Sequence, residues 1–191
     1  DNQFIDVEAF IECGCDDTLE EFRGRECVVG IDLSSGGDLT TLALEFDITD
    51  DEYYIYSHSF MPRGRIAEHI KTDKAPYDMW EKEKLITVTG GMADFKNDYK
   101  TIIKHLAELR DTYGLKFKGI AIDPHNADGI LSDLEEFGCP VAPITQSCKN
   151  LNDATCDVQL TVKSRKLRYD KRNSLLIWSF TNAITVANSF G

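Results

Sequence analysis

The sequence predicts an α/β fold in which a mixed β-sheet is flanked by helices. Three strand-like segments come first and in succession, at about residues 27–34, 39–47 and 52–61. Helical and strand-like segments then alternate, which is typical of β-α-β units. Antiparallel strands followed by such units give a sheet of mixed direction. The chain has 191 residues, 42% of them apolar, which suits one domain with a sizeable core.

The three leading strands are predicted from apolar runs and from the turns between them. Val28, Val29, Ile31 and Leu33 form a run that is typical of a strand buried on both faces. A Ser-Ser-Gly-Gly turn at 34–37 and the alternating pattern after it indicate a hairpin between the first two strands. A Thr-Asp-Asp turn and a tyrosine-rich run indicate a third, antiparallel strand.

The rest of the chain is predicted to consist of helices and short strands. Residues 62–93 contain prolines and glycines and are expected to be irregular. A long helix is expected at 94–113, because apolar residues recur there at helical spacing and Gly114 ends the pattern. The elements expected after it are a strand at 117–123, a helix at 125–137, a strand at 140–145, a helix at about 150–164, a strand at 167–170 and a helix at 173–187.

Two predicted strands each end in an aspartate. Asp32 stands near the end of the first apolar strand, where an unpaired buried charge costs several kcal/mol unless a metal cation or a ligand hydroxyl binds it. Asp123 ends the strand at 117–123, and Pro124 then stops the ladder because it lacks an N–H. Neighbouring parallel strands would bring both carboxylates to one edge, where a hard cation such as Mg²⁺ prefers oxygen ligands. Each aspartate could instead cap a turn or a helix.

Two further polar residues are candidates for contacting the aspartates and orienting their carboxylates. Asp38 follows Asp32 after one short turn, and it is either a supporting carboxylate or the cap of the second strand, which is favoured. Asn126 is expected at the same edge as Asp123, together with His125. For these two, a helix-capping or solvent-facing role is favoured over catalysis.

The charge of the chain is strongly acidic, with one basic window. A net charge of −12 argues against a free-standing nucleic-acid binder, because affinity for duplex DNA comes largely from cations that neutralise phosphates. Within residues 163–172 the pattern reverses, and this window is either a surface that faces phosphates or simply a solvated face. Its six cations are Lys163, Arg165, Lys166, Arg168, Lys171 and Arg172.

The spacing of the cysteines and the hydropathy of the chain indicate the cellular environment of the protein. The six cysteines lack the paired C-x-x-C spacings of a zinc site, so reduced thiols are expected. No apolar run reaches the roughly 18 residues of a membrane helix, and the acidic start is unlike a signal peptide. A soluble intracellular protein without membrane contact is therefore expected.

Six short segments, in order along the chain, resemble the ribonuclease H-like nuclease domain of tailed-phage terminase large subunits. They are Gly-Ile-Asp-Leu-Ser-Ser with Asp-Leu-Thr (30–40), Phe-Met-Pro (60–62), Ala-Pro-Tyr-Asp-Met-Trp (75–80), Thr-Val-Thr-Gly-Gly (87–91), Ile-Asp-Pro (122–124), and Asn-Ser-Leu-Leu-Ile-Trp (173–178) with Asn182. The resemblance implies a ribonuclease H-like mixed sheet flanked by helices. It also implies that residues 1–26 are a linker or arm from a preceding ATPase domain, and that 27–191 are a nuclease domain truncated at its C-terminus.

The same resemblance implies an activity and its partners. The family cuts concatemeric double-stranded DNA during genome packaging, by two-metal phosphodiester hydrolysis with Mg²⁺ or Mn²⁺. Asp32 would bridge two ions and Asp123 would hold one, while the family's third acid would lie beyond Gly191, so the fragment alone is expected to have an incomplete site. The implied partners are double-stranded DNA, the N-terminal ATPase domain of the same protein, the portal protein and the small terminase subunit. The implied location is the cytoplasm of the host of a phage or prophage.

Two other functions stay open on the sequence. Gly-Ile-Asp-Leu-Ser at 30–34 also resembles the first phosphate loop of actin-like ATPases and sugar kinases, although these need a second, similar domain. A non-catalytic ribonuclease H-like scaffold is the other alternative, which the net acidity and the missing third acid favour.

Overall fold

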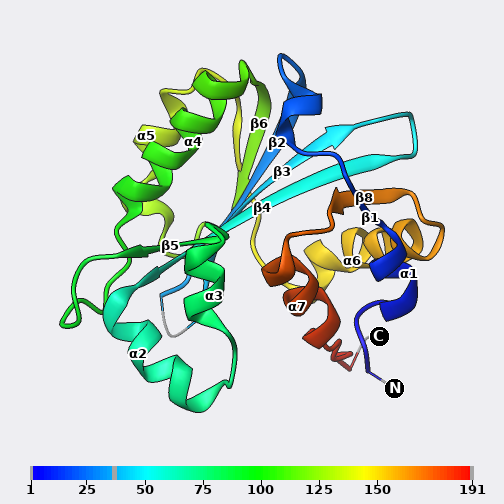
Figure 1. Cartoon of the computed structure of the whole chain (residues 1–191). Helices are drawn as coiled ribbons and strands as arrows, with labels where there is room; N and C mark the ends of the chain where they lie inside the picture. Colours follow the sequence, from blue (N-terminus) through cyan, green and yellow to red (C-terminus); the bar gives the residue numbers. More distant parts are fainter. Residues whose placement is uncertain (1, 36–37, 190–191) are drawn as a thin grey trace.

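The computed structural model describes residues 2–35 and 38–189 and forms one mixed sheet with helices on both faces (Figure 1). The strands are β1 (Gly14–Cys15), β2 (Glu26–Asp32), β3 (Thr40–Asp47), β4 (Tyr53–Pro62), β5 (Ile86–Thr89), β6 (Lys116–Ile122), β7 (Val141–Pro143) and β8 (Leu167–Asp170). Their order across the sheet is β1-β8-β4-β3-β2-β6-β7, and β5 pairs with β4.

The directions of the strands gather many strand ends at one edge. β3 is antiparallel to both β2 and β4, which confirms the three leading antiparallel strands. All other pairs of described strands are parallel. The carboxyl ends of β2, β4 and β6 therefore lie at the same edge, called the carboxyl edge below. The Ser-Ser-Gly-Gly turn predicted there includes residues 36 and 37, which lie outside the described residues.

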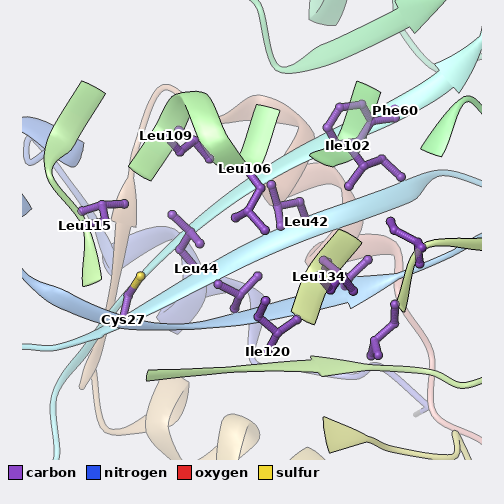
Figure 2. Close-up of a cluster of buried hydrophobic side chains, with 14 of the residues drawn as sticks. Cys27, Leu42, Leu44, Phe60, Ile102, Leu106, Leu109, Leu115, Ile120 and Leu134 are labelled. Atoms are coloured by element: carbon purple, nitrogen blue, oxygen red, sulfur yellow. The ribbon is translucent and has the colours of Figure 1, made fainter. Parts of the chain in front are cut away.

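One face of the sheet is closed by two helices, α4 (Tyr99–Tyr113) and α5 (Leu131–Glu135). Figure 2 shows side chains of α4 and α5 packed on those of β2, β3 and β6 in the largest cluster of buried residues. On α4, Ile102, Leu106 and Leu109 recur at helical spacing and are at most 7% exposed. Fully burying one such side chain stabilises a fold by about 1.5–3 kcal/mol, so this face holds the main core.

The other face is covered only in part. Its helices are α1 (Val7–Glu12), α6 (Cys148–Lys163) and α7 (Ser174–Asn182), which form a second cluster over β8 and the start of β4. β2 was predicted to be buried on both faces, and this is wrong, because Val28 on its second face is 41% exposed. Gly30 and Asp32 follow Val28 on that face, so the apolar run is in fact an alternating pattern with one core side.

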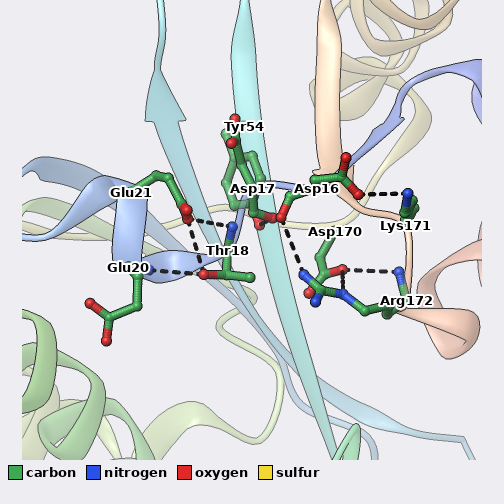
Figure 3. Close-up of polar contacts among 9 residues, drawn as sticks. All are labelled: Asp16, Asp17, Thr18, Glu20, Glu21, Tyr54, Asp170, Lys171 and Arg172. Carbon is green, nitrogen blue, oxygen red and sulfur yellow. Dashed lines mark hydrogen bonds and ion pairs between the residues drawn. The ribbon is translucent and has the colours of Figure 1, made fainter.

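Residues 2–26 pack on the sheet and helices formed by the rest of the described chain. In α1, Phe10 is fully buried and stacks on Tyr169 and Phe180, each with ring centroids 4.5 Å apart. β1 adds a parallel strand to β8. Figure 3 shows the contacts of the next residues along the chain. Thr18 and Glu21 form the capping box of the helical turn η1 (Leu19–Phe22). Tyr54 donates to the Asp17 carbonyl, and Lys171 and Arg172 bind Asp16.

Several boundaries differ from those expected. The region 62–93 contains α2 (Arg63–Thr72), α3 (Tyr77–Lys82) and β5, because Pro62 only precedes α2 and its missing N–H costs no hydrogen bond there. The helix expected at 125–137 is divided into the turn η2 (Ala127–Gly129) and α5, and α7 ends at Asn182. All six cysteines are free. Within the described residues, no helix has the length and hydropathy needed to cross a bilayer.

Candidate active site

The two strand-end aspartates lie side by side at the carboxyl edge. β2 and β6 are parallel neighbours, and their register pairs Ile31 with Ile122. Asp32 follows Ile31 in β2, and Asp123 follows Ile122 at the end of β6. Their backbones are therefore separated by about one strand spacing of 4.8 Å. Asp32 alternates with the buried Ile31 and so belongs to the uncovered face, and both aspartates line one cleft there. The predicted juxtaposition of the two residues is confirmed.

The cleft around the pair has a volume of about 370 Å³. Gly30, Ala43 and Ala121 line the cleft beside the aspartates. Ile144 and Gln146, from the segment before α6, and Leu151, in the first turn of α6, line it from the other side. A Cβ placed on Gly30 would meet no atom within 4 Å, so open space lies directly above the strand. Small residues in a strand interior allow a ligand to approach the backbone closely.

The carboxylates are oriented by uncharged donors. The Nε2 of Gln146 donates to Asp32 Oδ1 at 2.8 Å, and the backbone N–H of His125 donates to Asp123 Oδ1 at 2.9 Å. Within the described residues, neither aspartate forms an ion pair with a basic side chain. Two neighbouring carboxylates without a counter-charge repel each other, and a bound cation would relieve this repulsion.

The donor set fits a hard divalent cation. In the described parts of the chain, no three or more His, Cys, Asp or Glu residues come together as a ready-made metal cage. Mg²⁺ does not need such a cage, because it is commonly held by one or two carboxylates, with waters and substrate phosphates completing its shell. Asp32 and Asp123 provide that partial set of oxygen ligands in an open cleft.

Gln146 and Thr41 are site residues that the sequence analysis missed. Gln146 reaches Asp32 because β7 pairs with β6 and the Ile144 N–H bonds to the Ile122 carbonyl at 2.8 Å. Thr41 lies opposite Asp32 in the β2–β3 ladder, and its hydroxyl is 3.0 Å from that of Ser59. The sequence offered only a weak signal for Gln146: it is a polar residue just after β7, and the carboxyl end of β7 lies at the same edge as that of β6.

The supporting residues named from the sequence make fewer contacts than expected. Asp38 is exposed, and the hydrogen bond across the turn before β3 runs from the Ser34 N–H to the Thr40 hydroxyl, at 3.0 Å. Asn126 lies at the start of η2 in the left-handed conformation, with φ of 64°, and its side chain does not cap this turn.

The basic window lies away from the aspartates. It spans the end of α6, β8 and the residues after β8, and β8 is separated from β2 by β4 and β3, which is three spacings or roughly 14 Å. In the ladder of β4 and β8, Leu167 pairs with Tyr53, the first residue of β4. The window therefore begins at the end of β4 that lies opposite to the carboxyl edge. Four of the six cations pair with carboxylates: Arg165 with Glu12, Lys166 with Asp51 and Glu52, Lys171 with Asp16, and Arg172 with Asp170.

Comparisons with known proteins agree with this geometry. The family model described as terminase large subunit, endonuclease domain, matches residues 2–191. The large terminase subunit of Enterobacteria phage HK97 is 26% identical over 169 residues, which cover 87% of this chain and 32% of that protein. Protein YmfN of Escherichia coli strain K12 is 23% identical over 181 residues, covering 89% of this chain and 38% of that protein. The chain thus spans about a third of the length of these relatives.

Two solved structures share the fold. The crystal structure of the HK97 large terminase superposes with a TM-score of 0.83 at 25% identity, over 99% of this chain and 38% of that one. The large terminase nuclease of thermophilic phage G20c superposes with a TM-score of 0.53 at 11% identity, over 86% and 68%. These likenesses confirm the ribonuclease H-like fold and the resemblance found in the sequence. The chain belongs to the terminase large subunit endonuclease domain family.

Proposed function

We propose that this domain hydrolyses phosphodiester bonds of double-stranded DNA at the carboxyl edge, with Mg²⁺ or Mn²⁺ held by Asp32 and Asp123. The proposal is supported by the register of β2 and β6, in which two carboxylates lie beside each other in an open cleft and have no basic partner among the residues that the structure describes. Membership of an endonuclease family supports the same chemistry, and it favours a nuclease over the nucleotide-binding alternative.

Each residue of the site has a defined task in this proposal. Asp32 and Asp123 would hold the divalent ions, with Asp32 able to share its carboxylate between two of them. Gln146 and the backbone N–H of His125 each hold one oxygen of a carboxylate, which leaves the second oxygen for a cation. Two divalent ions at such a site acidify the attacking water and stabilise the leaving oxygen. The small residues of the cleft let the DNA backbone approach the carboxylates.

The biological setting follows from the relatives. We propose that the domain cuts concatemeric DNA during packaging of a phage or prophage genome, in the cytoplasm of the host cell. Its partners would be double-stranded DNA, an ATPase domain N-terminal to it in the same protein, the portal protein and the small terminase subunit. The similarity to the HK97 terminase large subunit supports this assignment.

Metal binding is the first test of the proposal. A ligand that binds only the folded state at 100 times its dissociation constant stabilises it by about 2.7 kcal/mol. For a domain of this size, that raises the melting temperature by roughly 5–10 °C. Mn²⁺ should therefore raise the melting temperature of the wild type, and Asp32→Asn should abolish the rise. Asp47→Asn is the matched control, because Asp47 is an exposed aspartate that ends β3 at the opposite edge.

Cleavage of supercoiled plasmid in Mn²⁺ separates the nuclease from a non-catalytic scaffold when the chain tested is extended through the position expected for the family's third acid. We expect Asp32→Asn and Asp123→Asn to lose cleavage and Asp47→Asn to retain it. A wild type that binds Mn²⁺ through Asp32 without cutting would support the scaffold, and a wild type without any response to Mn²⁺ would refute the metal site itself.

A further inference from the structure

The loop of residues 90–98, between β5 and α4, has a conformation that its own contacts specify. Gly90 adopts φ of 71°, and a Cβ at this position would lie 2.5–2.8 Å from the Asp94 side chain. Asp94 Oδ2 accepts the Gly91 N–H at 2.6 Å, and the Asp94 N–H bonds to the Gly91 carbonyl at 3.0 Å. The 90–98 loop is therefore a closed turn, and Figure 1 shows it extending from the body of the domain at the left of the view.

Three further bonds tie the 90–98 loop to the carboxyl edge. The Gly64 N–H, in the first turn of α2, donates to the Asp94 carbonyl at 2.9 Å. The Gly64 backbone lies so close to the loop that a Cβ on Gly64 would be 2.6 Å from the Asp94 carbonyl oxygen. The Arg65 Nε donates to the Phe95 carbonyl at 3.2 Å, and the Asn97 amide donates to the Ser34 carbonyl at 2.7 Å. Ser34 is two residues from Asp32, a chain distance of at most about 7 Å.

The 90–98 loop exposes apolar side chains, one lysine and two aspartates, and a second lysine follows it in the first turn of α4. Met92 is 65% exposed and Phe95 is 44% exposed. Lys96 and Lys100 are exposed, and within the described residues they form no ion pair, in contrast to most cations of the basic window. The two acids nearby are engaged by the backbone, since Asp94 binds the Gly91 N–H and Asp98 Oδ1 accepts the Lys100 N–H.

The chemistry of these side chains favours DNA as the occupant. Duplex DNA carries one negative charge for about every 1.7 Å of its axis, so a duplex positioned at the aspartate pair presents phosphates to neighbouring cations. Apolar side chains are used by many proteins against the sugars and base steps of the minor groove. A contact with a second protein would explain Met92 and Phe95 but not the unpaired lysines beside them.

We propose that the 90–98 loop is a DNA-contacting element that positions the duplex at the aspartate pair. Lys96 of the loop and Lys100, in the first turn of α4, contact phosphates, and Phe95 packs against the edge of the groove. The inference rests on the proposed function for the identity of the substrate, and it adds the surface that holds this substrate.

Binding of a short fluorescein-labelled DNA duplex, measured by anisotropy without divalent metal, tests the proposal. Each phosphate contact contributes about 0.9 to the slope of log affinity against log salt. The double variant Lys96→Ala/Lys100→Ala should therefore lower this slope by about 1.8, whereas Lys116→Ala/Lys118→Ala, at the opposite end of β6, should not change it. Phe95→Ser should weaken binding roughly fivefold, and Leu160→Ser, at a 63% exposed position on α6, should leave it unchanged.

The outcomes discriminate between the two proposals. Equal slopes for the two lysine double variants, or equal affinities for Phe95→Ser and Leu160→Ser, would overturn the role of the loop. If Phe95→Ser instead altered the oligomeric state in analytical ultracentrifugation at unchanged DNA affinity, the loop would be a contact between copies. The rise in melting temperature with Mn²⁺ should persist in every loop variant, so failure of the metal site would be seen separately, in the wild type.

Discussion

Asp32 depends on a neighbour that is far away in the sequence, Gln146. Partners that orient a metal ligand from behind typically change metal affinity by about 10–100-fold when removed. We expect Gln146→Ala to weaken Mn²⁺ binding about tenfold in calorimetry, with little change in stability because the bond is exposed. Gln159→Ala is the control, since Gln159 bonds to the Phe4 carbonyl at the other end of α6. Wild-type Mn²⁺ affinity in Gln146→Ala would show that this contact does not prepare the site.

A second residue-scale feature is a pair of stacked histidines inside the main core. The rings of His58 and His105 lie 4.1 Å apart, and His58 Nε2 is 2.6 Å from the Thr87 hydroxyl. Burial, together with His105, lowers the pKa of His58 to about 3, and burial also lowers the pKa of His105. In the unfolded chain His58 therefore binds a proton near pH 6.5, whereas in the folded chain it stays neutral at this pH.

Stability should consequently decrease as the pH falls from about 6.5 towards 3. His58→Gln keeps a polar atom near Thr87 but cannot be protonated, so we expect its urea midpoint to depend less on pH in this range. His125→Gln, at an exposed position, should follow the wild type. If His58→Gln showed the same pH dependence as the wild type, the buried pair would not be a source of acid sensitivity.

At the scale of elements, the basic window around β8 remains a predicted contact for DNA. Neutralising Arg165, Lys166 and Arg168 should weaken duplex binding and lower its salt dependence. The cost in stability should be small, because exposed ion pairs such as Arg165–Glu12 contribute little in high-dielectric solvent. Binding isotherms over a range of salt concentrations measure the effect. An unchanged slope would remove the window from the DNA surface and leave the 90–98 loop as the main candidate.

Elements with a strong local pattern were predictable, and those decided by packing were not. The body of α4 was predicted because its apolar residues follow the helical period and Gly114 takes the left-handed conformation at its end. Its start at Tyr99 was missed, because residues 94–98 belong to a loop held by α2 and Ser34. β2 was expected to be buried on both faces, but Val28 on its second face is 41% exposed.

At the scale of the whole molecule, the position of the site could be predicted but its surroundings could not. Asp32 and Asp123 each end a recognisable strand, and the carboxyl ends of parallel neighbours share one edge. Gln146 and Asn97 reach this edge through contacts across 114 and 63 residues, and no local pattern encodes such contacts. The same holds for the apolar residues of 2–15, which are buried only because β8 and α7 pack against them.

The second hydrophobic cluster draws α1 from the start of the chain and Val162, Tyr169 and α7 from near its end. During synthesis, α1 leaves the ribosome before β8 and α7, so the residues against which it packs are made more than 140 residues later. The main core, in contrast, is assembled from residues 19–134. The residues of the main core can therefore pack early in synthesis, while α1 stays exposed and Phe10 is accessible to chaperones until α7 has been made.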